Sequence, residues 1–440
     1  MAPDPPLTAE QPRASLPRRL GAALRRRPRT SAAAGALLLA AAAVAGVFTW
    51  AAYQFHAAGR ALGDGDAAAA LAHVRLGLRV RPDSAEGHLL AARAERQGGD
   101  YPAAERDLQT CIRLQNGATA ATQMEWLMLR AQRGEVDEVA PGLWYCVEQG
   151  HPDSDAILEA LARAYMHQFR LGAALECLDR WLARRPDCPR ALDWRGWVHE
   201  RLEQREAARQ DYRRALELDP GRSEVRMRLA AMLLDDAKPA EAAPHLERLR
   251  HELPGRTGVL VSLAHCRAME GDFAEARRLT DEVLARHPDD AEALLELGRL
   301  DLEEGRAADA EAALRHGLKV SPYRLPIRFS LWQSLQRQPG REGDAAEAKA
   351  AYDALKTDLD RLTKLLGSGG SKSREDPAAA AEVGALLLRT GEERLALEWL
   401  DVALKLDPRS PGAHETLAAY YEKKGEAEKA EEHRRAARQP

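Results

Sequence analysis

The sequence predicts an all-α protein, a right-handed α-solenoid of about eleven helix pairs preceded by a single transmembrane helix. Two observations carry this prediction: a 34-residue period through most of the 440 residues, and a long uncharged stretch near the N-terminus. Composition agrees with both. Charged residues make up 30% of the chain and aromatic residues only 5%, which suits amphipathic helices that meet through small side chains.

The uncharged stretch follows an arginine-rich N-terminal tail. No Asp, Glu, Lys or Arg occurs between Arg29 and Arg60, and about 20 apolar residues suffice to cross the hydrocarbon core of a bilayer. We therefore expect a basic cytoplasmic tail over residues 1–30 and a transmembrane helix over residues 31–53. Because the arginines precede the helix, the positive-inside rule places everything after it outside the cytoplasm. The expected location is the inner or plasma membrane of a bacterial cell envelope, with a periplasmic array.

A cleaved signal peptide is the alternative to an anchor. Ala43, Val44 and Ala45 offer a small-residue cleavage site after a shorter apolar run. The apolar run continues to Tyr53, however, which is longer than the apolar core of about 7–15 residues that signal peptides have. Its length favours the anchor.

The period is marked by proline at one position of each unit and by small residues at two others. If proline is position 32, position 20 is alanine in all ten matching units, and position 8 is almost always alanine or glycine. Small residues at facing points let two helices cross closely. The prolines spaced by 34 are Pro152, Pro186, Pro220, Pro254, Pro288 and Pro322.

This combination of positions resembles the tetratricopeptide repeat family over about residues 51–438. The resemblance implies stacked helix pairs that bind other proteins or peptides, with the first helix of each pair lining a concave face. We expect the array over residues 54–366, with an irregular last unit whose second helix is overlong from Asp344 to Leu366. A Gly/Ser-rich linker at 367–376 and two C-terminal repeats over 377–440 follow.

No pattern in the sequence indicates catalysis. Motifs for metal binding, phosphate binding and nucleophilic catalysis are missing, and the five cysteines form no C-x-x-C pair. We expect no enzyme activity, no catalytic residue, no cofactor, no metal and no small-molecule substrate. The net charge of −4 argues against nucleic acid as a partner. Cys177 and Cys188 are close enough in sequence to form a disulfide bond in an oxidising compartment. The preferred interpretation is that both are unpaired, small, buried residues.

Candidate partner-binding residues follow from the ligand-facing positions of the resembled family. Trp and Arg at such positions are the residues most enriched in binding hot spots; the alternative is that the tryptophans pack between repeats. The acidic residues at position 5 suggest a mixed apolar and charged ligand, such as a basic segment or helix. The candidates are Arg93, Glu125, Trp126, Glu159, Arg163, His167, Asp193, Trp194 and Trp197.

The expected function is a membrane-anchored scaffold, or a docking or assembly factor, that binds peptides or helices of partner proteins on the concave face. Two alternatives stay open. One is a regulatory or targeting subunit of an enzyme encoded elsewhere, and the other is an import-receptor-like protein whose repeats face the cytosol.

Overall fold

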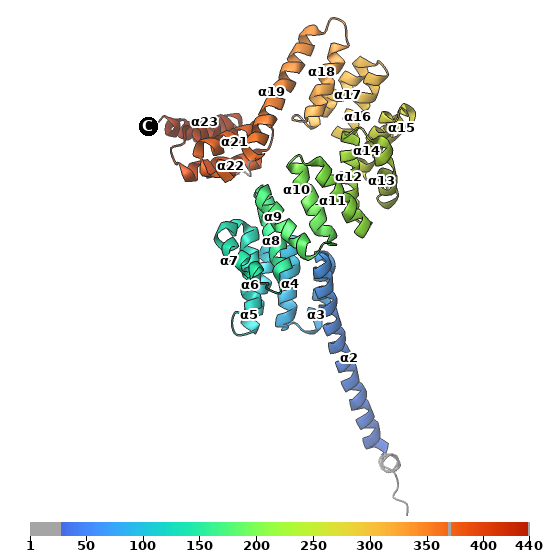
Figure 1. Ribbon diagram of the computed structural model, residues 1–440, viewed down its shortest axis with the longest axis vertical. Helices are drawn as coiled ribbons and strands as arrows, with labels where there is room; N and C mark the ends of the chain where they lie inside the picture. The colour runs from blue at the N-terminus through green and yellow to red at the C-terminus, as the bar shows by residue number, and fades with distance from the viewer. Residues whose placement is uncertain (1–27, 368–370, 439–440) are drawn as a thin grey trace, which may run out of the picture. The chain divides into compact units, whose positions relative to one another are not determined.

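The computed structural model describes residues 28–367 and 371–438, and every regular element in these residues is a helix (Figure 1). The chain forms two compact units that divide between Arg130 and Ala131. The predicted tail lies outside the described residues up to Arg27. The first unit contains α2 (Pro28–Asp64), α3 (Ala67–Val80), α4 (Ala85–Gly98), α5 (Tyr101–Leu114) and α6 (Ala120–Arg130).

The second unit begins with a π-helical turn, Ala131–Glu135, in which Gly134 has a φ of 111°. Helix pairs then follow to the end of the described residues. They are α7 (Val136–Glu148), α8 (Ser154–His167), α9 (Leu171–Arg184), α10 (Pro189–Arg201), α11 (Arg205–Leu218), α12 (Ser223–Asp235), α13 (Pro239–Glu252), α14 (Thr257–Met269), α15 (Phe273–Arg286), α16 (Ala291–Glu303), α17 (Ala307–Val320), α18 (Leu325–Gln336), α19 (Glu342–Gly367), α20 (Ser371–Glu375), α21 (Pro377–Arg389), α22 (Glu393–Leu406), α23 (Pro411–Lys423) and α24 (Ala427–Ala437).

The predicted succession of helix pairs is confirmed in the described residues. Ten pairs lie within one unit or the other, which are α2/α3, α4/α5, α8/α9, α10/α11, α12/α13, α14/α15, α16/α17, α18/α19, α21/α22 and α23/α24, while α6 ends the first unit and α7 follows in the second.

The contact surface between the two helices of a pair explains the period. All ten alanines at position 20 are buried, with exposed fractions between 0% and 6%. Position 8 is equally tight: a Cβ built on Gly298 would lie 2.6 Å from Leu314 Cγ, and one on Gly196 would lie 2.7 Å from Tyr212 Cε1. We call this contact surface the seam. Close packing at the seam favours a small residue at position 20 in every matching unit and at position 8 in most of them.

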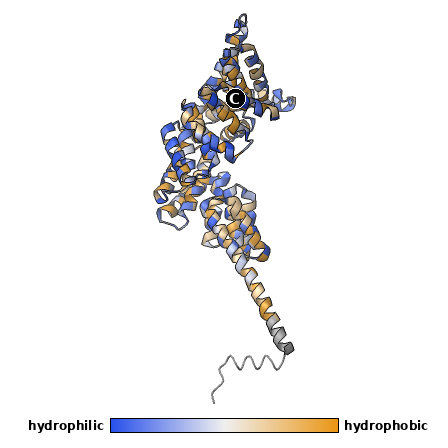
Figure 2. Cartoon of the chain, turned by 90° about the vertical axis from the view of Figure 1, so that its right-hand side faces the viewer, coloured by the Kyte–Doolittle hydropathy of each residue, from blue (hydrophilic) through white to orange (hydrophobic). Residues whose placement is uncertain are grey.

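Helix α2 serves two parts of the molecule. An 18-residue window within Ala36–Asp64 reaches a mean hydropathy of 1.9, and among the described residues this is the one helix long and apolar enough to cross a membrane. Figure 2 shows the apolar residues along the half of α2 that precedes the repeats. From Ala51 onward the same helix is buried on one face and forms the first helix of the first pair.

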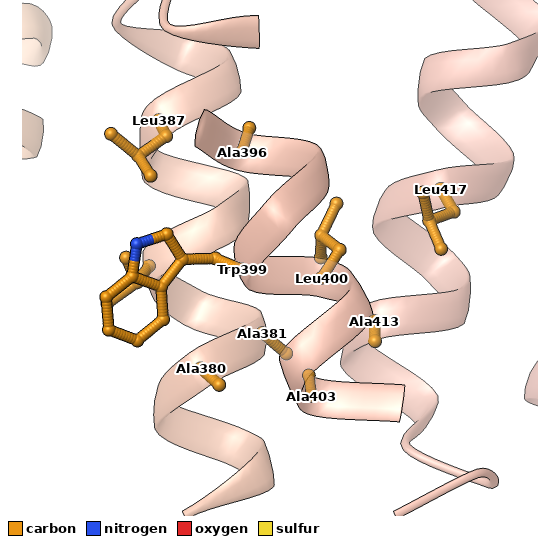
Figure 3. Close-up of a cluster of buried hydrophobic side chains, with 10 residues drawn as sticks. Ala380, Ala381, Leu387, Ala396, Trp399, Leu400, Ala403, Ala413 and Leu417 are labelled. Atoms are coloured by element: carbon orange, nitrogen blue, oxygen red, sulfur yellow. The ribbon is translucent and has the colours of Figure 1, made fainter. Parts of the chain in front are cut away.

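The second unit ends in an irregular pair and two regular ones. The overlong helix is present as α19, of 26 residues. Its last turns, with Leu362, Leu365 and Leu366, pack against a buried cluster in α21, α22 and α23 that Figure 3 shows around Trp399. Within the predicted linker the structure places the short helix α20, and residues 368–370 lie outside its description. The division at 367–376 stays a prediction.

Candidate functional site

Two neighbouring repeats of the second unit form an open pocket of about 330 Å³. Trp194 and Trp197 on α10 form one wall, because residues three apart share a face of a helix. The end of α8 and the turn after it form the other wall. The residues that line this pocket, called here the aromatic pocket, are Arg163, Met166, His167, Phe169, Trp194 and Trp197.

Both tryptophans are held on one side and open on the other. The ring of Trp194 packs edge-on against buried Trp181, with 6.0 Å between ring centroids. The ring of Trp197 lies 6.3 Å from that of Phe169. Trp194 and Trp197 are both half-buried, while Trp181 is only 1% exposed. The pocket therefore presents rigid aromatic surface to a ligand.

Phe169 was not among the predicted site residues, yet it completes the pocket. It has a φ of 56°, a left-handed conformation that most other repeats give to glycine at the same place, as at Gly99 and Gly271, although Glu203 and Ala237 adopt it too. A bulky residue in this conformation is strained by about 1–3 kcal/mol and persists when its surroundings impose it. A phenylalanine, 43% exposed, where the turn favours glycine was the sequence signal that could have found it.

Positive charge surrounds the aromatic walls. Arg163 Cζ lies 5.5 Å from the ring centroid of Trp194, and Arg201 Cζ lies 5.3 Å from that of Trp197. His167 is exposed beside them, and its pKa is lowered by partial burial and by the charge of Arg163. At neutral pH the edge of the aromatic pocket thus carries the two guanidinium groups and an uncharged imidazole.

The acidic residues at position 5, Glu159 and Asp193, are paired with arginines of their own protein. Glu159 is 2% exposed and accepts a hydrogen bond from Arg190 Nη2 at 3.1 Å. Asp193 accepts one from Arg228 Nη1 at 2.7 Å. Burial raises the pKa of Asp193, and the charge of Arg228 opposes that shift. These carboxylates therefore neutralise arginines of their own protein.

The remaining candidates lie in the first unit and are described separately. Glu125 is 1% exposed and forms ion pairs with Arg96 and Arg93, the latter at 3.4 Å between Nε and Oε2. Trp126 is half-buried on α6. As in the second unit, the position-5 carboxylate joins helices rather than lining a surface. The assignment of these residues to a partner stays a prediction.

The cysteines and the acidic residues provide no further site in the described residues. All five cysteines are free, and Cys177 and Cys188 are both buried. Burial raises the pKa of Cys177, which keeps it a protonated thiol. No group of three or more metal-ligating side chains is found in the part of the chain that the structure describes.

Comparison with known proteins gives matches at two levels. Two tetratricopeptide repeat family models match the chain, one at residues 189–222 and one at residues 267–322. No curated protein matches the sequence.

Solved structures show similarity at low identity. The type IV pilus biogenesis factor PilW is 21% identical, with 47% of this chain and 98% of that chain covered and a TM-score of 0.40. YrrB, described as a tetratricopeptide repeat protein with an unusual peptide-binding site, is 19% identical, with 43% and 96% covered and a TM-score of 0.37. A tetratricopeptide repeat protein from Parabacteroides merdae is 16% identical, with 65% and 99% covered and a TM-score of 0.34.

The small-residue seam recurs in every matching unit, and the model matches fall on α10/α11 and on the segment from the end of α14 to the end of α17. Proteins built in this way act in protein–protein interaction. The residues that the two models match, 189–222 and 267–322, are tetratricopeptide repeats.

Proposed function

We propose that the protein is a membrane-anchored docking or assembly factor that binds a peptide or helix of a partner protein in the aromatic pocket. The observation that carries the proposal is the pair of half-exposed tryptophans, Trp194 and Trp197, set over an open pocket of about 330 Å³. Tryptophan and arginine are enriched among the residues that dominate the energy of protein interfaces, and tryptophan also offers a large rigid surface at little cost in conformational entropy.

The charges at the pocket favour a partner segment with one apolar or aromatic side chain next to a carboxylate. The apolar side chain would stack on Trp197 and Phe169, and the carboxylate would meet the guanidinium of Arg163 or Arg201. Arginine suits this role because its planar group can hold a carboxylate with two hydrogen bonds. A basic segment is disfavoured, because the carboxylates near the pocket, such as Glu159, already neutralise arginines of this chain.

Copurification from detergent with the full-length chain tests the pocket. Replacing Trp197 by Ala is expected to weaken binding of the copurifying partner by about 2 kcal/mol or more, or roughly thirtyfold. Tyr145→Ala is the matched control, since Tyr145 is 64% exposed in the same unit and lies outside the pocket. Equal partner recovery with both variants would refute the pocket. Recovery of one stoichiometric enzyme would instead favour a regulatory subunit.

The anchor and its orientation are part of the same proposal. Residues 31–53 would cross the membrane with the arginine tail in the cytoplasm and the repeats outside. A reporter that is active only outside the cytoplasm should be active when fused after Pro440 and inactive when fused before Ala2. The reverse pattern would favour repeats that face the cytosol, and a mature N-terminus at Gly46 would show a cleaved signal peptide.

A further inference from the structure

Helix α2 passes from full exposure to tight packing without a spacer. Every residue from Ala36 to Trp50 is exposed, whereas Ala51 is 0% exposed and Phe55 is 2% exposed. If residues 31–50 cross the hydrocarbon core, which needs about 20 residues, the first repeat begins among the lipid headgroups. Trp50 and Tyr53 are 44% and 57% exposed, as suits aromatic residues at a membrane interface.

Helix α3 runs back along α2 toward this interface. Ala58 and Val74 share one buried cluster, and Leu62 and Ala70 share the next, so the two helices are antiparallel. At the end nearer the apolar half of α2, a Cβ built on Gly77 would lie 2.4 Å from Phe55 Cε1. The residues after Gly77 therefore lie still closer to the level of Trp50 and Tyr53.

Two arginines lie in this returning segment. Arg79 is exposed in the last turn of α3, and Arg81 Cζ lies 6.0 Å from the ring centroid of Phe55 on the anchor helix. Neither forms an ion pair with a residue that the structure describes. We call residues 78–86 the proximal rim. It also contains two exposed carboxylates: Asp83 lies just before α4, and Glu86 lies in the first turn of α4.

The end of α5 belongs to the same edge of the first unit. His88 near the start of α4 bonds Asp107 of α5, with 2.6 Å between Nδ1 and Oδ1. Since α4 and α5 are also antiparallel, the last residues of α5 reach past this bond toward the proximal rim. They include Arg113 and Leu114, and Leu114 is 36% exposed. A third arginine and an exposed leucine thus face the same side.

We propose that the proximal rim binds the phosphate groups of anionic phospholipids through Arg79 and Arg81, supported by Arg113. This inference rests on the membrane anchor of the proposed function. Guanidinium groups match phosphate in a two-pronged geometry, and long arginine side chains reach from a protein edge into the headgroup layer. An anionic surface attracts such residues within a Debye length of it. The contact fixes the first unit on the membrane at two places, the anchor and the rim.

Hydrogen exchange on the full-length chain in lipid nanodiscs tests this contact. The discs contain phosphatidylcholine alone or phosphatidylcholine with phosphatidylglycerol, and exchange is followed at the amides of residues 78–86. We expect exchange about tenfold slower in the anionic discs, since two arginines near a charged surface resist opening of the segment that carries them. High salt should remove the difference.

Variants separate the arginines from general charge effects. Arg79→Gln with Arg81→Gln should abolish the lipid dependence, while Arg60→Gln with Arg106→Gln should leave it unchanged. Arg60 and Arg106 are exposed in the same unit but lie farther from the interface along α2 and α5. The wild-type comparison between the two lipids needs no substitution, so it stands even if a variant folds poorly.

The outcomes distinguish the anchor from the rim. If the chain enters discs of neither composition, both the anchor and the lipid contact are overturned. If it enters both and the rim exchanges equally fast, the lipid contact alone is wrong. If inorganic phosphate slows exchange as much in phosphatidylcholine discs, the rim is a site for free anions and the lipid assignment is overturned.

Discussion

Between the two helices of a pair the chain places alanine or glycine and buries it, whereas on α10 it places Trp194 and Trp197 and leaves them half exposed. The seam repeats with the same residue types along the array because two backbones must approach closely there. The aromatic pocket lies on positions that the packing leaves open. In this repeat protein, the residues that stabilise the fold therefore differ from the residues available for binding. Positions that depart from the repeat pattern indicate the binding residues.

The turns of the array show the same contrast. Most turns within a pair use glycine in the left-handed conformation, as at Gly271 with a φ of 85°, while Phe169 adopts a φ of 56°. Glycine accepts this geometry without strain and phenylalanine does not. The turn at the pocket therefore gives up local stability and gains an aromatic ring beside Trp197.

The largest loss of stability is expected from a substitution in the core next to the aromatic pocket. Trp181→Ala should lower the free energy of unfolding by about 3–5 kcal/mol, because it empties a fully buried site. Trp197→Ala should cost clearly less, since its side chain is half-buried. Thermal or urea unfolding of both variants measures the difference. Equal losses would show that Trp197 is a core residue, and the pocket assignment would be withdrawn.

A methyl group added to the seam tests its tightness. Gly298→Ala should destabilise the protein by about 1–3 kcal/mol, because the new Cβ collides with Leu314 and a packed core tolerates extra atoms poorly. Gly142→Ala is the control: it lies in α7 with no heavy atom within 4 Å of the added Cβ. It should be neutral or stabilise by up to about 1 kcal/mol. Urea unfolding compares them, and equal effects would contradict a tight seam.

Glu95 is a buried carboxyl group in the first unit, and it tests how burial affects stability as the pH changes. Burial and the nearby Asp107 raise its pKa from 4.5 to about 8. A carboxyl group with a raised pKa binds its proton more tightly in the folded state, so its stabilising contribution is present below about pH 4.5 and is lost as the pH rises through 8. Glu95→Gln should therefore flatten the decline in melting temperature between these values. An unchanged pH profile would place Glu95 in contact with water.

The smallest effect on stability is expected at the strained turn. Phe169→Gly should leave the free energy of unfolding unchanged or raise it by up to about 1 kcal/mol, because glycine relieves the left-handed strain. Partner binding should weaken, since the pocket loses a wall. Ala237→Gly relieves the same geometry, with a φ of 56°, and should leave binding intact. Loss of binding in both variants would point to the turns in general and not to Phe169.

Part of the lining of the aromatic pocket was predicted from the sequence. Trp194, Trp197, Arg163 and His167 were predicted from their positions, and the structure brings these four together. Phe169 was missed because it lies in a turn, where no ligand-facing position was expected. Glu125 and Glu159 were included because their positions match, but position does not say whether a carboxylate meets solvent or an arginine of another helix, such as Arg190.

The sequence by itself determined the succession of helix pairs and the long apolar stretch near the N-terminus. Periodicity and helix length are local properties, and a small residue every 34 positions records a backbone contact that recurs. Only the tertiary structure decided which charged residues form ion pairs within the protein. It also decided that Trp181 is buried while Trp194 is half-buried, and that Arg81 lies against Phe55. Those outcomes depend on which side chains from different helices meet, and this is set by three-dimensional packing rather than by spacing along the chain.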